Sequence, residues 1–172
     1  MKKVLIIFLF FIFKSNLAIA ELNIVFINMN EVISTSKAGS SIMKQLKDIK
    51  TKNSSKFQKD AKMLKEKETK LISQRNILSD VDFQTNINKL KLEIKNYNDN
   101  RNKIGDDFNK LKIDSTNRLL KLINPIIVKY SNENSISLIL QKKDLIIGKT
   151  ELDITSEIIE IINTDISVFK IQ

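Results

Sequence analysis

Apolar positions change their period twice along the chain and so divide it into segments of different structure. Residues 22–29 are β-branched and aromatic enough to predict a buried strand, and Asn30 is expected to cap a short helical turn after it. Between Ser40 and Leu78 the apolar residues are widely spaced among Lys, Gln, Glu and Ser, and no proline interrupts them. This stretch predicts one long polar helix.

Heptad spacing predicts that this helix packs along one seam. An apolar residue recurs every seven positions, at Phe57, Leu64, Leu71 and Leu78. The companion seam positions are Ala61, Glu68 and Arg75, so the seam is half polar. This indicates a looser arm than a strict zipper.

A second long helix is predicted by unbroken 4-3 spacing from Phe83 to Ser115. Ser79 is placed to cap its start, and Asp80 and Asp82 lie in its first turn, where the helix dipole favours negative charge. Two stretches of similar period with a break between them indicate an antiparallel helical hairpin of roughly 55–60 Å.

The last third of the chain predicts a return to a small body. Pro125 interrupts an otherwise helical run, so a kink or a restart of the helix is expected there. Residues 136–141 and 145–147 have the composition of two strands joined by a turn, which predicts a β-hairpin. Asp153 or Thr155 is expected to cap a last helix, whose apolar face contains Ile154, Ile158, Ile161 and Ile162.

Together these elements predict an α+β fold that is mainly α, with a long coiled-coil arm on a small β body. The body comprises residues 21–39, with a strand and a short helix, and 119–172, with the end of the return helix, the β-hairpin and the last helix. The arm comprises residues 40–118. Because small sheets with free edges pair with other chains, we expect oligomerisation to complete the body.

Composition argues against an enzyme. The 172 residues include no His and no Cys, which excludes Ser-His-Asp and Cys-His nucleophiles, structural zinc sites and disulfides. Three glycines cannot build a phosphate-binding loop or a dinucleotide fingerprint. No cofactor or metal is therefore expected.

A cleaved signal peptide is predicted for residues 1–20. A Lys-Lys pair follows the first Met, residues 4–13 are apolar, and residues 18–20 (Ala-Ile-Ala) form a small-x-small cleavage pattern. The apolar run is too short to span a bilayer, although an uncleaved anchor is the alternative. We expect an exported protein.

Charge is concentrated in the arm. Residues 44–112 contain 18 Lys and Arg against 10 Asp and Glu, whereas the rest of the mature chain contains 8 against 10. Such a field attracts anionic lipid, lipopolysaccharide or acidic polypeptide. Nucleic acid is not expected, because the protein is exported and its arm lacks interleaved aromatic residues. The candidate client-binding lysines are Lys44, Lys47, Lys56, Lys59, Lys62 and Lys65.

Some apolar residues of the arm fall outside its seams. Single exposed apolar residues are ordinary on protein surfaces. The alternative is a dispersed lining that holds unfolded chains without a specific pocket. These candidates are Met63, Ile72, Ile77, Leu92 and Ile113.

The two ends of the mature chain carry motifs that flank the hairpin. Residues 23–32 (NIVFINMNEV) lead to SKAG at 36–39, and residues 138–155 (LILQKKDLIIGKTELDIT) are closely followed by EIIEIIN. With a signal peptide and a basic hairpin between these ends, the chain resembles the Skp/OmpH family of periplasmic chaperones.

The resemblance implies a homotrimer whose small β-barrel body is built from all three chains and whose three arms enclose a cavity. It implies an ATP-independent holdase that binds unfolded outer-membrane proteins and prevents their aggregation in transit. The alternative is a structural coiled-coil spacer or adaptor of the cell envelope. An adaptor would bind a defined partner through the arm tip around residues 79–83.

Overall fold

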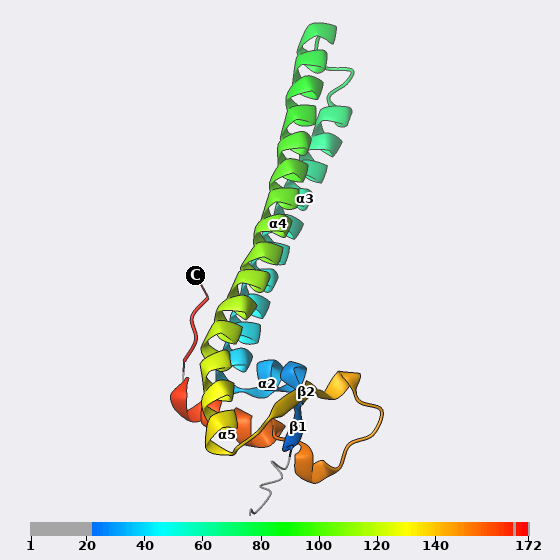
Figure 1. Cartoon of the computed structure of the whole chain (residues 1–172). Coiled ribbons are helices and arrows are strands. Elements are labelled where there is room, and N and C mark those ends of the chain that lie inside the picture. The colour runs from blue at the N-terminus through cyan, green and yellow to red at the C-terminus, as the bar shows by residue number, and fades with distance from the viewer. Residues whose placement is uncertain (1–21, 167, 172) are drawn as a thin grey trace, which may run out of the picture.

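The computed structural model describes residues 22–166 and 168–171, so the predicted signal peptide lies outside the described residues. The element order is β1 (Ile24–Ile27), α2 (Met29–Thr35), α3 (Lys37–Ser73), α4 (Asp80–Glu133), β2 (Leu138–Gln141), η1 (Lys142–Asp144), η2 (Thr150–Leu152) and α5 (Thr155–Asp165). Two long helices form an arm, and the other elements gather at its foot as a small body (Figure 1). The predicted fold class is confirmed, whereas completion of the body by oligomerisation stays a prediction.

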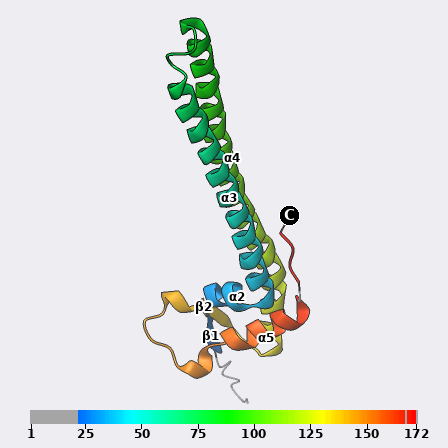
Figure 2. The ribbon, with the colours of Figure 1, turned by 180° about the vertical axis from the view of Figure 1, so that it is seen from behind.

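The arm is the antiparallel hairpin of α3 and α4, which lie side by side in views from opposite sides (Figures 1 and 2). α3 has 37 residues and α4 has 54, which correspond to about 55 Å and 80 Å. α3 ends at Ser73 and not at Leu78, because residues 74–78 form the turns that reverse the chain.

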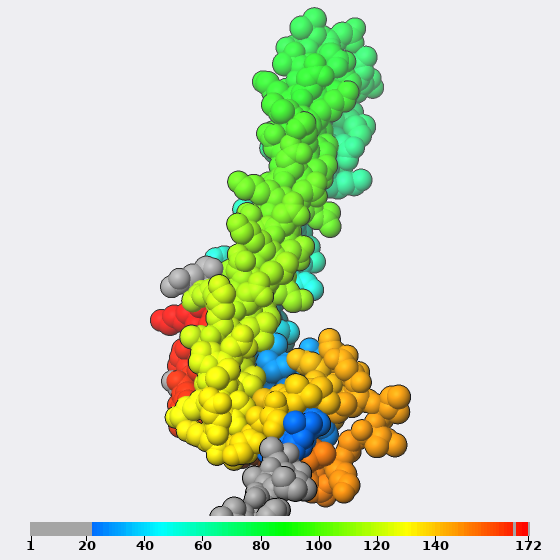
Figure 3. Space-filling view, in the orientation of Figure 1, coloured from blue at the N-terminus to red at the C-terminus, as the bar shows by residue number. Residues whose placement is uncertain are grey.

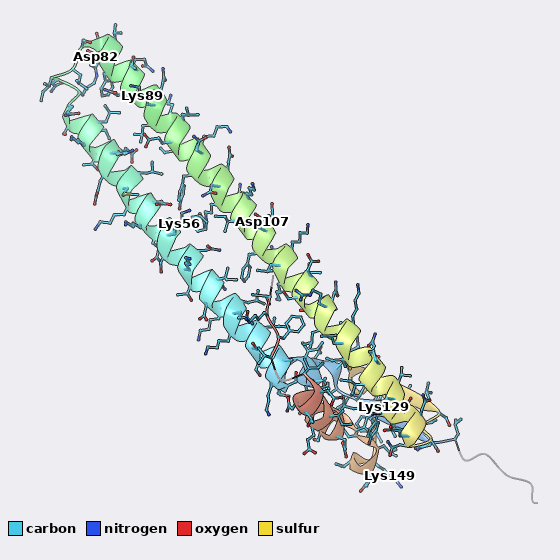
Figure 4. All side chains as sticks on the ribbon, turned by 90° about the vertical axis from the view of Figure 1, so that its left-hand side faces the viewer. Lys56, Asp82, Lys89, Asp107, Lys129 and Lys149 are labelled. Carbon is cyan, nitrogen blue, oxygen red and sulfur yellow. The ribbon has the colours of Figure 1, made fainter. Side chains whose placement is uncertain are left out.

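The tip of the arm is closed by local contacts. Ser79 caps α4 as predicted, since its Oγ accepts a hydrogen bond from the Asp82 N–H at 3.1 Å. The Arg75 guanidinium lies 2.9 Å from the Asp80 carboxylate and 4.6 Å from the centre of the Phe83 ring. Asp82 marks this end of the molecule in Figure 4. The tip is therefore ordered without a hydrophobic core.

α4 continues through Pro125, which excludes the restart that was one of the two outcomes expected there. The proline leaves the Lys121 carbonyl without its intrahelical donor. Both residues are exposed, so water can reach that carbonyl. Leu119 and Ile123, just before the proline, are fully buried and hold this part of the helix on the body.

The sheet consists of β1 and β2, paired in parallel from Ile24 opposite Leu138 to Ile27 opposite Gln141. Parallel neighbours need a long crossover, and the whole arm is that crossover. On its other edge β1 meets the segment before α5: Phe26 forms a parallel bridge with Asp153, and the Ile154 N–H donates to the Phe26 carbonyl at 3.0 Å. β1 is therefore the central strand of the body.

The predicted β-hairpin over 136–147 is wrong. Only its first strand forms, as β2, and its partner is β1; residues 145–147 form no strand. Their side chains find little cover, since Ile146 and Ile147 are 101% and 91% exposed. The segment belongs to a loop that projects from the body (orange in Figures 1 and 3). An apolar composition suggested a strand, but residues 142–144 form the 3₁₀ helix η1 in place of a tight hairpin turn, and residues 145–147 do not pair with β2.

The hydrophobic core lies in the body and at the foot of the arm. It joins β1, α2, the first turns of α3, the lower part of α4 and α5, with Val32, Leu119, Ile123, Ile158 and Ile162 fully buried. On α3 the last buried residue is Leu46, and on α4 the first is Ser115. No residue from 47 to 114 is buried. The arm projects from the core and does not extend it.

The SKAG motif forms a tight junction between α2 and α3. Ser36 is fully buried and caps α3, with its Oγ accepting the Gly39 N–H at 3.2 Å. A Cβ at Gly39 would lie 1.5 Å from the Ile33 carbonyl oxygen, so only glycine fits. The motif that contributed to the family resemblance therefore has a structural role at the foot of the arm.

The LDIT motif locks the start of α5 to β1. Ile154 stands at the N-cap position, and the predicted capping residue Asp153 accepts the Thr155 N–H at 3.0 Å. The Thr155 Oγ1 accepts the Asn28 N–H at 2.9 Å, and Lys142 Nζ lies 2.7 Å from Asp153. Burial raises the pKa of Asp153, but hydrogen bonds from Lys142 and Thr155 outweigh burial and hold that pKa below its usual value.

A C-terminal tail after α5 returns to the foot of the arm (red in Figures 1 and 2). Phe169 is only 4% exposed, and the Arg118 guanidinium of α4 lies 5.1 Å from the centre of its ring. Gln45 of α3 pairs with the tail backbone twice, donating to the Phe169 carbonyl at 2.7 Å and accepting the Ile171 N–H at 3.3 Å. The tail thus bridges both arm helices.

We predict that Phe169→Ala lowers the free energy of unfolding by about 3 kcal/mol, because it removes a buried ring from the foot of the arm. Val168→Ala is the matched control, since Val168 is 71% exposed, and it should change stability by less than about 0.5 kcal/mol. Urea titration followed by circular dichroism at fixed protein concentration measures both. Equal effects of the two substitutions would contradict a docked tail.

Candidate functional site

The six candidate lysines all lie on α3 and are exposed. A step of three residues turns about 60° backwards around a helix of 3.6 residues per turn, so successive lysines wind around α3 and do not share one face. Within the described part of the chain, no carboxylate lies within 4 Å of the ammonium groups of Lys44, Lys47, Lys56 or Lys59. The arm therefore carries a broad positive field and not a focused anion site.

Two of these lysines have weak partners. Lys62 lies 3.9 Å from Glu66, and Lys65 lies 3.9 Å from Glu68. All four side chains are highly exposed, so water and salt screen both pairs. The ion pairs leave the positive character of α3 in place.

The five off-seam apolar candidates are exposed and lie far apart on the arm. Ile72 and Ile77 lie near the tip, where the structure adds Val81, a residue that the seam analysis did not single out. Met63 borders a shallow hollow between the arm helices, next to Lys67 and Glu93, which form a 2.6 Å ion pair across it. The other candidates are not brought together into a common surface.

The body exposes a second set of apolar residues that the sequence analysis missed. Ile146 and Ile147 project on the loop after η1. Their exposure was missed because the sequence pattern predicted a strand there. A hollow of about 410 Å³ lies elsewhere on the body, between α2, α4 and β2, and is lined by Ile33, Ile127 and Ile139 among others. The chain therefore carries both a projecting apolar loop and an apolar hollow.

The described residues contain no group of three or more acidic side chains that could hold a metal ion. None of the helices described is long and apolar enough to cross a membrane. Burial raises the pKa of Tyr130, with a smaller contribution from Glu157, but this hydroxyl lies at the foot of the arm among core residues.

The chain is thus an elongated molecule with a long, exposed, basic arm on a small body. The sequence profile of a family described as "Outer membrane protein (OmpH-like)" matches residues 23–162. The chain therefore belongs to the OmpH-like family. A search of curated proteins found no match.

Among solved structures, the chain is similar to a protein from Caulobacter crescentus CB15, described as a candidate outer membrane chaperone (OmpH-like). The two share 11% sequence identity with a TM-score of 0.83, over 87% of this chain and 89% of that one. At this identity the likeness shows a common fold.

The family match confirms the resemblance that the end motifs indicated. Membership of this family supports a chaperone role in general terms. The match ends at residue 162, so the tail with Phe169 lies beyond the matched region.

Proposed function

We propose that this protein is an ATP-independent periplasmic holdase that binds unfolded outer-membrane proteins and prevents their aggregation in transit. Its N-terminal signal peptide directs export and is then cleaved. The observation that carries this proposal is the arm surface: no residue from 47 to 114 is buried, and residues 44–112 contain 18 basic against 10 acidic residues.

Such a surface suits a client that has no fixed shape. Screened charge attracts an acidic polypeptide over about 10 Å at moderate ionic strength, before any contact is made. Scattered apolar residues such as Ile72, Leu92 and Ile113 then add many weak contacts. Many weak contacts hold a chain firmly in sum, yet each one releases easily. Anionic lipid and lipopolysaccharide are further partners of the same field, and nucleic acid is not.

We also propose that the body is completed by self-association into a homotrimer. β2 pairs with β1 along one edge, and half-exposed Leu138 lies on this strand. The projecting Ile146 and Ile147 and the apolar hollow near Ile33 and Ile139 are different surfaces of one chain. Contacts between unlike surfaces close into a ring when the rotation between copies allows it. The number three rests on the family resemblance.

The holdase proposal predicts that the mature protein suppresses light scattering when a urea-unfolded outer-membrane β-barrel protein is diluted into buffer. Suppression should be nearly complete at stoichiometric excess and should weaken as NaCl rises, because salt screens the arm field. No suppression at excess would refute the proposal.

A charge-matched pair of variants locates the effect on the arm. Replacing four arm lysines with Gln should raise the concentration needed for half-suppression several-fold; these are Lys56, Lys59, Lys62 and Lys65. Replacing four exposed lysines outside the arm and away from both proposed self-association surfaces removes the same charge and should change it little; these are Lys37, Lys121, Lys129 and Lys170. Equal effects would show that net charge alone matters.

For self-association, the double variant Ile146→Asp, Ile147→Asp should dissociate the trimer to protomers in sedimentation or light scattering. The tip variant Ile77→Asp, Val81→Asp places the same charges on equally exposed residues and should remain trimeric. A wild-type protein that is monomeric at micromolar concentration would contradict the trimer. Complete loss of function in the tip variant would favour the adaptor, because an adaptor depends on its tip, whereas a holdase should lose only part of its capacity.

A further inference from the structure

A hollow of about 430 Å³ opens between α3 and α4 in the middle of the arm. Three aromatic residues line it, Phe57 from α3 with Tyr97 and Phe108 from α4, together with Lys50, Arg101 and Gly105. We call these six residues the arm hollow. Lys56 and Asp107, labelled in Figure 4, are the sequence neighbours of Phe57 and Phe108 and indicate its height on the arm. None of the six candidate lysines and none of the off-seam apolar candidates lines it.

We infer that the arm hollow is a docking site for an aromatic side chain of an extended polypeptide segment that also carries acidic residues. This inference rests on the proposed holdase function and gives it a defined contact point on an otherwise diffuse surface. The occupant is a segment of an unfolded client.

Packing between the two arm helices does not require a glycine at position 105. A glycine inside a helix costs about 1 kcal/mol relative to alanine and is usually retained where another group must approach closely. Here a Cβ built on Gly105 would have nothing within 4 Å outside its own helix. The glycine therefore serves no close contact in the folded chain, and the space next to it is open to a larger side chain.

The rings are held in place before any ligand arrives. Phe57 and Tyr97 meet edge to face, with ring centres 6.2 Å apart and planes at 86°. The Tyr97 hydroxyl donates a 3.4 Å hydrogen bond to the Phe57 carbonyl across the two helices. Edge-to-face geometry is favourable for aromatic pairs, and an aromatic guest can extend such a cluster. A preformed site avoids the cost of ordering its walls.

The positive charge of the lining favours client segments in which acidic residues flank the docked aromatic residue. The residues lining the hollow include two cations, Lys50 and Arg101, and no acidic residue. A segment that places Asp or Glu beside its aromatic residue would pair with these cations, and Arg101 can also stack on the aromatic ring. A basic segment would be repelled.

The chain itself shows how its arm helices take an aromatic residue from an extended segment. On another part of the same helix pair, Phe169 is buried beneath Arg118, and Gln45 bonds the tail backbone on both sides of Lys170. The lining around the arm hollow also offers an arginine, Arg101, and side-chain amides, Asn53 and Gln58, and it adds the aromatic rings. Because this hollow is open, the backbone of a guest can continue along the arm.

Two substitutions at Gly105 separate filling the hollow from changing the helix. Gly105→Leu places a side chain in the open space, whereas Gly105→Ala raises helix propensity and leaves the hollow largely empty. Circular dichroism and thermal unfolding check that both variants fold. The probe is a Gly-Ser peptide with a central Asp-Trp-Asp. The protein contains no Trp, so fluorescence of the indole reports the peptide alone.

We expect saturable binding with a blue shift for the wild type and for Gly105→Ala, and affinity at least about tenfold weaker for Gly105→Leu, the loss of a buried aromatic contact being about 1.4 kcal/mol or more. A Lys-Trp-Lys peptide should bind more weakly than Asp-Trp-Asp. Equal affinities of the two Gly105 variants, or no saturable binding by the wild type, would overturn the inference. Equal affinity for N-acetyltryptophanamide would make the hollow a small-ligand site and also overturn it.

A second measurement, suppression of client aggregation by the wild type, Gly105→Ala and Gly105→Leu, separates failure of the docking site from failure of the holdase proposal. If all three suppress aggregation equally and Gly105→Leu binds the peptide normally, the docking site fails and the holdase remains. If the wild type suppresses nothing, the holdase itself fails, whatever the peptide result.

Discussion

A helix that has only one neighbour cannot bury its side chains, and this constraint governs the whole molecule. α3 and α4 touch each other along the arm but nothing covers them from outside, so the last buried residues are Leu46 and Ser115 at the foot. Stability must come from the body and from the junctions that bind it to the arm. The junctions to the arm are the Ser36–Gly39 turn and the docked Phe169, and the Asp153–Thr155 contacts hold α5 on β1 within the body.

The same constraint provides the surface that the proposed function needs. An arm with no core of its own presents nearly all of its side chains to solvent, and its charge does not have to be neutralised by packing. Client contacts can therefore be spread over lysines, single apolar residues and one aromatic hollow without disturbing the fold. Because the arm crosses from β1 to β2, its foot is fixed by the sheet register, and its length can vary without affecting the body.

Local patterns predicted the arm well. The Ser79 cap and the half-buried seam residues Phe57, Leu64 and Leu71 follow from spacing along one helix and agree with the structure, whereas Leu78 lies in the turns beyond α3. The β-hairpin over 136–147 failed because residues 142–144 form a 3₁₀ helix in place of a tight turn, so that the apolar segment after it stays exposed and unpaired with β2. Phe169 was missed because one of its partners, Gln45, lies more than a hundred positions away along the chain. The role of Gly105 was missed because it depends only on the open space between the two arm helices.

Hydrogen exchange of backbone amides in the mature protein tests most directly whether stability is confined to the foot of the arm. Amides of residues 119–123 and 158–162 should exchange only through global opening, whereas those of residues 60–100 should open locally and exchange about a hundredfold faster or more. Equal protection along the whole length of α3 and α4 would contradict this account, because it would mean that the arm is stabilised by a cover that the fold of a single chain does not contain.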